Sequence, residues 1–136
     1  MLGIPNYGYS WPLPYERGVT KARLIGNVEA NVIAAERGVE IQYDERYQSP
    51  FFHYEIGGRR YEVWFEDVRS IYAKLQLAAE KDIRGVGYWN LMRPFRANWL
   101  LVNQMLQLKK GWTFLEQSIY NVIIYAKMQM RKRGKR

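Results

Sequence analysis

Residues 84–101 read RGVGYWNLMRPFRANWLL, and this stretch combines a buried strand with the start of a helix. The run from Val86 to Leu91 is short and apolar, which is typical of a strand buried in a sheet. Asn98 can begin a helix. The apolar residues that follow it at helical spacing are Leu101, Val102, Met105 and Leu106. A strand followed directly by a helix is one unit of an α/β fold.

The N-terminal part of the chain is expected to contain another strand and another helix. We expect a strand at residues 1–4, followed by a long loop that its prolines hold extended. Asn27 is expected to cap a helix that reaches about Arg37 and ends at Gly38. The predicted apolar face of this helix comprises Val28, Val32 and Ala35.

The middle of the chain predicts a hairpin and a further helix. Residues 39–43 resemble a short strand, and Gly57-Gly58 separates two strand-like runs, which indicates a hairpin. Asp67 can cap the next helix. The apolar positions of that helix are Val68, Ile71, Tyr72, Leu75 and Ala79. The predicted order is therefore strand, helix, small hairpin insertion, helix, strand and helix.

This alternation predicts an α/β fold built from parallel strand–helix units. Two such units cannot close a sheet, because they leave strand edges unpaired and an apolar face uncovered. We therefore expect the chain to be incomplete on its own. Self-association, or a missing half that completes the fold, would cover these edges.

Composition bounds the chemistry that the chain can perform. The chain has 136 residues, which is the length of one domain, and 48% of them are hydrophobic, which excludes a wholly disordered protein. It has no cysteine, which excludes disulfides, thiolate metal sites and cysteine catalysis. Its single histidine, His53, excludes a multi-histidine metal site. We accordingly expect no metal and no cofactor.

The formal net charge of +8 is concentrated at the C-terminal end of the chain. Residues 121–136 hold six basic side chains and no acidic one, which leaves a nearly balanced body. Nucleic acid is therefore an unlikely partner for the body. No secretory signal is evident at the N-terminus, and the apolar stretch at residues 114–130 is too polar to span a membrane.

Five stretches, taken in order, resemble glycoside hydrolase family 18, in its branch of spore peptidoglycan hydrolases (cortex-lytic N-acetylglucosaminidases). They read LGIPNYGYSWPLPY (2–15), TKARLIGNVEA (20–30), IQYDERYQSPFF (41–52), GGRRYEVWFEDVRSIYAKL (57–75) and RGVGYWNLMRPFRANWLL (84–101). The resemblance implies the C-terminal part of a (β/α)8 TIM barrel, with its last two strand–helix units and the hairpin insertion between them. Residues 1–110 would form this part, and residues 111–136 an apolar and then basic tail, helical or disordered.

The resemblance also implies which catalytic residues are missing. The family cleaves with a D-x-x-D-x-D-x-E motif, in which the glutamate is the general acid and an aspartate orients the N-acetyl group of the substrate. The aspartates here are Asp44, Asp67 and Asp82, so none are separated by a single residue. We therefore expect no catalytic residue in this chain, and no hydrolysis by the chain alone.

Although the catalytic motif is missing, the sequence does contain aromatic residues that match the family's sugar pocket. The resemblance assigns Tyr7 to the wall of the −1 subsite and Trp89 to its floor, since sugar C–H groups pack on flat aromatic surfaces. Tyr9 and Trp11 would form outer-subsite walls. The alternative for all four is a structural role, in which the aromatic rings cover a core or complete a turn.

The other polar residues that could be catalytic are better explained by structural roles. Glu66 and Asp67 resemble a pair of catalytic acids, but a helix cap at Asp67 with a solvated Glu66 beside it is the favoured interpretation. The segment from Tyr43 to Glu45 is expected to have a structural hydrogen-bonding role rather than to contact substrate. His53 has no evident partner and is not expected to be catalytic.

The leading hypothesis is a fragment of a hydrolase that acts on N-acetylglucosamine-containing wall glycan, such as spore peptidoglycan or a chitin-like polymer. The alternative is a catalytically dead remnant that binds carbohydrate or self-associates. The resemblance implies a spore, cell-wall or extracellular location. Residues 112–128 can form an additional amphipathic helix, and the basic end is either solvated or binds an anionic polymer.

Overall fold

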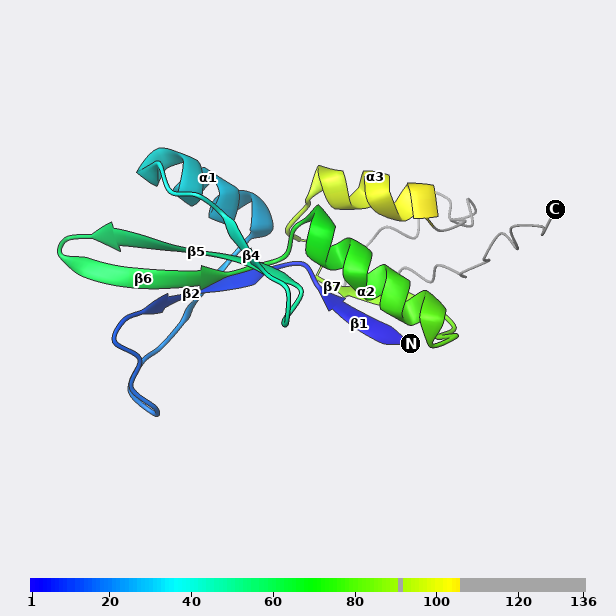
Figure 1. The fold of residues 1–136 in the computed structure, drawn as a ribbon, viewed down its shortest axis with the longest axis horizontal. Helices are drawn as coiled ribbons and strands as arrows, with labels where there is room; N and C mark the ends of the chain where they lie inside the picture. The colour runs from blue at the N-terminus through cyan, green and yellow to red at the C-terminus, as the bar shows by residue number, and fades with distance from the viewer. Residues whose placement is uncertain (91, 106–136) are drawn as a thin grey trace.

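The computed structural model describes residues 1–90 and 92–105 (Figure 1). The elements follow in the order β1 (Leu2–Pro5), β2 (Gly8–Pro12), β3 (Arg23–Ile25), α1 (Asn27–Arg37), β4 (Gln42–Asp44), β5 (Ser49–Ile56), β6 (Arg59–Trp64), α2 (Val68–Glu80), β7 (Val86–Trp89) and α3 (Arg96–Met105). They form a parallel pair of strands and a separate antiparallel sheet. The expected amphipathic helix and basic tail lie outside the described residues.

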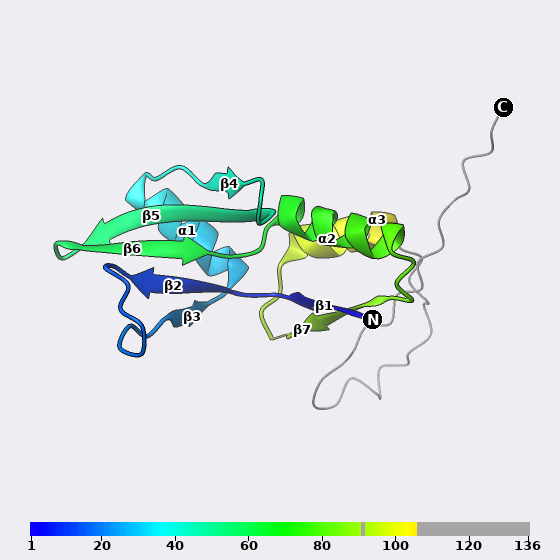
Figure 2. The ribbon, with the colours of Figure 1, turned by 60° about the horizontal axis from the view of Figure 1, so that its bottom comes forward.

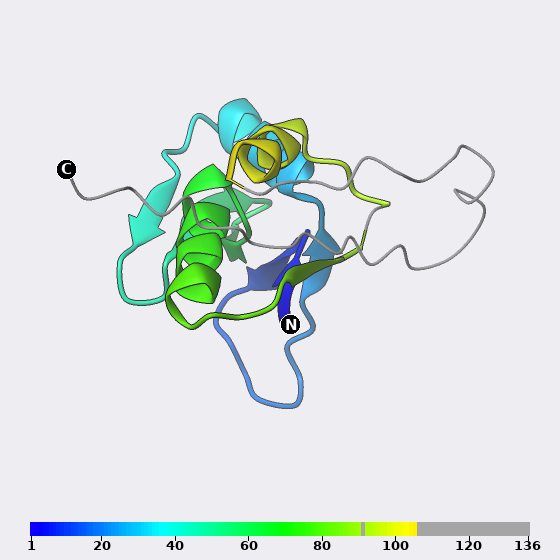
Figure 3. The same ribbon diagram turned by 90° about the vertical axis from the view of Figure 1, so that its right-hand side faces the viewer.

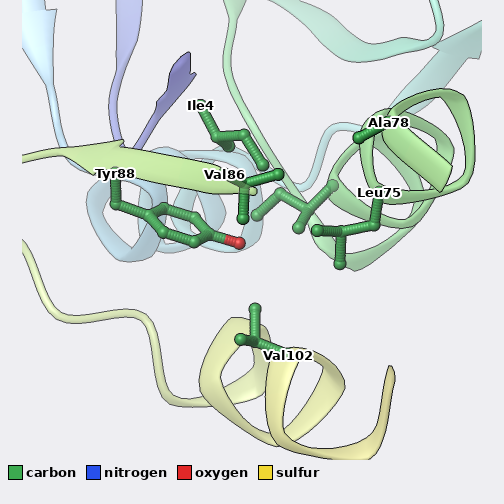
Figure 4. Close-up of a cluster of buried hydrophobic side chains, with 7 residues drawn as sticks. Ile4, Leu75, Ala78, Val86, Tyr88 and Val102 are labelled. Atoms are coloured by element: carbon green, nitrogen blue, oxygen red, sulfur yellow. The ribbon is translucent and has the colours of Figure 1, made fainter. Parts of the chain in front are cut away.

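Strands β1 and β7 are parallel, with Ile4 opposite Tyr88 and Pro5 opposite Trp89. One face of this pair packs against α2 and α3, and the seven buried side chains of this core include Ile4, Val86 and Val102 (Figure 4). The structure thus confirms the two predicted strands at the ends of the described chain, β1 and β7. It also confirms the predicted helix after β7, which is α3. Within the described residues, β1 and β7 pair only with each other.

Helix α2 begins where the sequence predicts it. The Asp67 carboxylate accepts hydrogen bonds from the backbone N–H groups of Arg69 and Ser70, which satisfies two donors of the first turn. The buried face contains Ile71 and Leu75, as predicted. Its third apolar member is Ala78, whereas the predicted member Tyr72 is 43% exposed.

The middle of the chain forms a five-stranded antiparallel sheet rather than a small hairpin insertion. Its strand order is β3-β2-β6-β5-β4. The predicted hairpin is confirmed at β5 and β6, where Gly57 and Gly58 have φ values of 59° and 71° that suit a tight hairpin turn. The predicted loop after residue 6 is wrong in part, because residues 8–12 pair as β2 with both β3 and β6.

Helix α1 covers one face of this antiparallel sheet and does not belong to a parallel strand–helix unit. Ala30 and Ala34 pack against Phe52 and Val63 of the sheet. The predicted apolar face is wrong, since Val28 and Val32 are 51% and 47% exposed. Small side chains let the helix backbone approach the sheet closely, so alanine takes the buried face. The predicted cap is wrong by one residue, because Gly26 is the N-cap and Asn27 is the first residue of the helix. As predicted, the helix ends at Gly38.

The two sheets are arranged end to end. Figure 2 shows β1 continuing towards β2, so the carboxyl ends of β1 and β7 face the antiparallel sheet. Figures 1 and 3 agree that α1 and α3 lie on the same side of the strands. The opposite side of both sheets is therefore free of the described helices. None of the described helices is long and apolar enough to cross a membrane.

Candidate sugar-binding site

Trp89 is the last residue of β7 and points away from the helices. Along β7 the side chains alternate, and Val86 and Tyr88 are buried in the core shared with α2 and α3. Trp89 lies on the other face and is 58% exposed. The peptide bond between Trp89 and Asn90 is cis. A large, flat aromatic side chain is thus accessible at the carboxyl end of a parallel strand.

Tyr88 is a structural residue that supports this strand. Its hydroxyl donates a 2.9 Å hydrogen bond to Oδ1 of Asn98 in α3, and its ring packs 5.2 Å from that of Trp99. Burial raises the pKa of Tyr88 to about 12 because the phenolate is poorly solvated there. The neutral hydroxyl therefore connects β7 to α3, and only Trp89 of this aromatic pair is available to a ligand.

The buried side chain of Asn6 holds the loop that follows Trp89. The backbone N–H of Asn6 donates to the Trp89 carbonyl at 2.7 Å. The side-chain amide of Asn6 donates to the carbonyls of Asn90 and Arg93. Because buried polar groups are costly when unpaired, these bonds fix the backbone of Trp89 and of the residues that follow it.

The same network reaches the antiparallel sheet through Asn27 and Glu66. The Asn27 amide donates to Oδ1 of Asn6 at 3.3 Å, and the Glu66 backbone N–H donates to Oδ1 of Asn27 at 3.1 Å. The Glu66 carboxylate accepts from Ser70 Oγ at 2.6 Å and from Lys74 Nζ at 2.8 Å. The expectation of a solvated Glu66 is therefore wrong, and its carboxylate is a buried structural acceptor.

Tyr7, Tyr9 and Trp11 form a continuous row of aromatic rings that leads away from the end of β1. The ring centroids of Tyr7 and Tyr9 are 5.7 Å apart, and those of Tyr9 and Trp11 are 6.0 Å apart. Tyr15 extends the row, with its ring 5.9 Å from that of Trp11. Tyr9 is 40% exposed, and Tyr7 and Trp11 are half-buried. Strand β2, which was expected to be a loop, fixes the spacing of this row.

The remaining polar residues that the sequence singled out have local partners. Oδ1 of Asp44 accepts hydrogen bonds from the backbone N–H groups of Arg46 and Tyr47 at 2.9 and 2.7 Å, which agrees with a structural role for this segment. His53 does have a partner, which corrects the expectation. Its Nε2 lies 2.9 Å from Oε2 of Glu62, its neighbour across β5 and β6.

A surface cavity of about 510 Å³ lies elsewhere, on the helical side of the molecule. Its lining includes Tyr43, Arg69 and Tyr72, together with Leu101 of α3. None of the four predicted sugar-binding residues contributes to it. Within residues 1–90 and 92–105, no three acidic or histidine side chains gather as metal ligands would.

Comparison with known proteins identifies the homologues of the chain. No family model matches it. It is 46% identical over 111 residues to the "Cortical fragment-lytic enzyme" of Bacillus subtilis, an alignment that covers 81% of this chain and 26% of the relative. It superimposes with a TM-score of 0.73 and 46% identity on the spore cortex-lytic enzyme SleL of Bacillus megaterium, covering 76% of this chain and 24% of that one. The chain is a homologue of the cortex-lytic branch of glycoside hydrolase family 18.

The chain is also similar to a chitinase and to a sporulation-specific glycosylase. A chitinase from Chromobacterium violaceum superimposes with a TM-score of 0.66 at 28% identity over 75% of this chain. The putative sporulation-specific glycosylase YdhD of Bacillus subtilis is 45% identical over 103 residues. The chain spans about a quarter of the length of the cortical fragment-lytic enzymes, with a mixed α/β fold that their family shares.

Proposed function

We propose that the chain is the C-terminal part of a family 18 glycosidase barrel acting on N-acetylglucosamine-containing glycan of the spore cortex or cell wall. The observation that carries the proposal is Trp89, exposed at the carboxyl end of β7 on the face away from α2 and α3. In a (β/α)8 barrel, active sites form at the carboxyl ends of the strands. The similarity over 81% of this chain to a cortical fragment-lytic enzyme supports the same substrate class.

In this proposal β1 and β7 are the seventh and eighth strands of the barrel. Helices α2 and α3 would belong to the outer ring, because they pack on the face of β1 and β7 opposite to Trp89. The antiparallel sheet with α1 would be an insertion after the seventh strand. The outer edges of β1 and β7 would pair with strands of a missing barrel segment or of a second copy. Residues 1–110 would form the barrel part, and residues 111–136 would be a separate tail.

Trp89 would form the floor under the −1 sugar, and Tyr7 would stand beside it. An indole buries a large area of sugar C–H surface while losing little conformational entropy. Tyr9 and Trp11 would contact the neighbouring sugars. The general acid and the aspartate that orients the N-acetyl group would come from a segment containing the D-x-x-D-x-D-x-E motif, which this sequence lacks.

The absence of that motif from the sequence favours a second candidate function, in which this chain binds glycan without cleaving it. Both candidates predict that the purified chain alone does not hydrolyse N-acetylglucosaminides. They differ in whether hydrolysis appears when a segment carrying the D-x-x-D-x-D-x-E motif is added, which we expect only for the barrel fragment. Hydrolysis by the chain alone that survives purification and is lost in Trp89→Ala would contradict both candidates.

Titration with N-acetylglucosamine oligomers, followed by tryptophan fluorescence, tests whether the chain binds sugar. Saturable binding should weaken at least tenfold in Trp89→Ala and persist in Tyr72→Ala. Tyr72 is a suitable control because it is 43% exposed but belongs to α2, on the helical side of the molecule. A wild-type chain that gives no saturable change with millimolar oligomer would overturn sugar binding by this chain.

A further inference from the structure

The face of the antiparallel sheet opposite to α1 carries an unassigned group of aromatic and ionisable side chains. Strand pairing places Tyr9 opposite Trp64, and Trp64 opposite Phe51. Directly paired residues of antiparallel strands project from the same face, so these three residues form one row across β2, β6 and β5. The next row, built in the same way, comprises Trp11, Glu62 and His53.

Intervening positions of the same strands confirm which face these rows occupy. Val63 and Phe52, each one residue away along its strand, are buried against Ala30 and Ala34 of α1. Since side chains alternate along a strand, the two rows lie on the face that α1 does not cover. Phe51, Trp64, His53 and Glu62 are half-buried, so each retains accessible surface.

The aromatic side chains of these rows hold each other rigidly. The rings of Phe51 and Trp64 stack with their centroids 4.7 Å apart and their planes 17° apart. Tyr47 packs edge-on against Trp64 at 6.0 Å. The indole N–H of Trp64 donates to Oε1 of Glu62 at 2.6 Å, which fixes the indole. A ligand that contacts these rings therefore orders few side chains on binding, which lowers the entropic cost of association.

Glu62 and His53 add hydrogen-bonding groups beside the rings. Their side chains are 32% and 29% exposed, and Oε2 of Glu62 lies 2.9 Å from Nε2 of His53. A carboxylate offers about four lone-pair positions, of which Trp64 and His53 occupy two. The remaining positions can accept hydrogen bonds from hydroxyl or amide N–H groups. Apolar rings beside such an acceptor match the alternating C–H and O–H surface of a sugar.

This group of residues is connected to Tyr7, the proposed wall of the −1 subsite. Tyr7 follows β1 by two residues, and its ring contacts that of Tyr9, which lies opposite Trp64 across the strands. From Tyr9 to Trp11 the face extends about 7 Å along β2, and from Tyr9 to Phe51 about 10 Å across the strands. A glycan that has one sugar on Trp89 and extends along Tyr7 would therefore meet these two rows next.

We propose that Phe51, Trp64, Glu62 and His53 form a distal subsite that binds a linear N-acetylhexosamine glycan several units away from the −1 sugar. This proposal rests on the proposed function, because the glycan reaches the distal subsite from the Trp89 subsite. Its consequence is a preference for long glycan: an oligomer long enough to contact both subsites binds more tightly than a dimer that fills only the first.

The test compares N-acetylglucosamine dimer and hexamer, titrated against the full 136-residue chain by isothermal calorimetry. We expect the hexamer to bind at least tenfold more tightly than the dimer. Trp64→Leu should lower hexamer affinity at least fivefold and leave dimer affinity within twofold. Tyr61→Leu is the matched control, since Tyr61 belongs to the same strand but stacks on Tyr54, on the α1 side of the sheet.

Two further measurements keep the test decisive if Trp64→Leu does not fold. Glu62→Ala should also lower hexamer affinity without changing dimer affinity. In the wild-type chain, the NMR signal of the Trp64 indole N–H should shift with hexamer and not with dimer. A shift of this signal on addition of a peptidoglycan stem peptide alone would assign the face to peptide and overturn the proposal.

The outcomes separate this inference from the proposed function. Equal affinities for dimer and hexamer, with Trp89→Ala weakening both, would overturn the distal subsite and leave the proposed function intact. A wild-type chain that binds neither oligomer would overturn both. Length-dependent binding that Trp64→Leu and Glu62→Ala leave unchanged would also overturn the distal subsite.

Discussion

Asn6 and Asn27 form a buried amide pair that joins the two sheets of the molecule. Nδ2 of Asn27 lies 3.3 Å from Oδ1 of Asn6, and the two residues are only 2% and 0% exposed. Asn6 follows β1 directly, whereas Asn27 is the first residue of α1, on the antiparallel sheet. The position of the loop after Trp89 is therefore coupled to the position of the antiparallel sheet.

We predict that Asn6→Ala is strongly destabilising. The substitution leaves the Asn27 amide and the carbonyls of Asn90 and Arg93 without a partner, at a cost of about 3 kcal/mol or more. Urea unfolding measures the loss. Asn31→Ala is the control, since Asn31 is exposed on α1 and its loss should cost about 0.5 kcal/mol or less.

The pair can also be tested by a double-mutant cycle. Asn6→Ala and Asn27→Ala together should cost less than the sum of the single substitutions, because each one already breaks their shared bond. We expect a coupling free energy of about 1 kcal/mol. Strictly additive effects would contradict a direct interaction between the two amides.

We predict that Gly8→Ala destabilises the chain by about 2 kcal/mol or more, since added volume in a closed site forces the backbone to shift. A Cβ atom at Gly8 would lie 2.4 Å from the Trp64 carbonyl oxygen and 2.5 Å from Cβ of Phe65. Gly3 is the matched control, because a Cβ there has no neighbour within 4 Å. Gly3→Ala should leave the urea midpoint nearly unchanged. Similar losses in both variants would contradict a steric cause.

We predict that Lys74→Met costs more stability than Glu66→Gln. The Glu66 side chain is only 8% exposed, so removal of the Lys74 ammonium leaves a buried carboxylate without its counter-charge, at a cost of about 3 kcal/mol. Glu66→Gln removes the charge and keeps an acceptor for Ser70. Thermal unfolding at neutral pH ranks the two variants, and the reverse order would contradict this account.

We predict an alkaline loss of stability that depends on Tyr88. Its pKa is raised to about 12 in the folded chain, above the ordinary tyrosine value, so the folded state resists loss of the proton. The stabilisation is complete below about pH 10 and is lost as the pH rises through about 12, with a total of about 2–3 kcal/mol. Urea unfolding at about pH 9 and pH 11.5 should show a smaller decrease in Tyr88→Phe. Equal decreases in both proteins would exclude this contribution.

Much of the parallel strand pair and its helices was predictable from local signals. The Asp67 cap and the spacing of Ile71 and Leu75 identified α2, and the apolar run from Val86 identified β7. These signals suffice because each helix buries a stripe of large apolar side chains. The resemblance to a known family singled out Trp89 as a pocket residue, and the structure leaves its side chain 58% exposed.

The antiparallel sheet was harder to predict because its burial depends on distant neighbours. Pro12 and Pro14 suggested a loop, yet Pro12 ends β2 opposite Tyr61. Gly8 and Ser10 are buried, but small residues at alternate positions give little hydrophobic signal. The uncovered aromatic face could have been found from the alternation of Phe51 and His53 with Pro50 and Phe52, which are buried on the same strand.

The chain enters and leaves the antiparallel sheet at adjacent points. Gly8 packs directly on Trp64 and Phe65, and the Glu66 N–H is bonded to Asn27 beside Asn6, so the two crossings lie next to each other. Segments with adjacent ends can be exchanged without separating the elements around them. Residues 8–65 therefore form an exchangeable segment, and transplanting it between relatives would transfer one wall of the proposed sugar-binding site while β1, β7 and their helices stay unchanged.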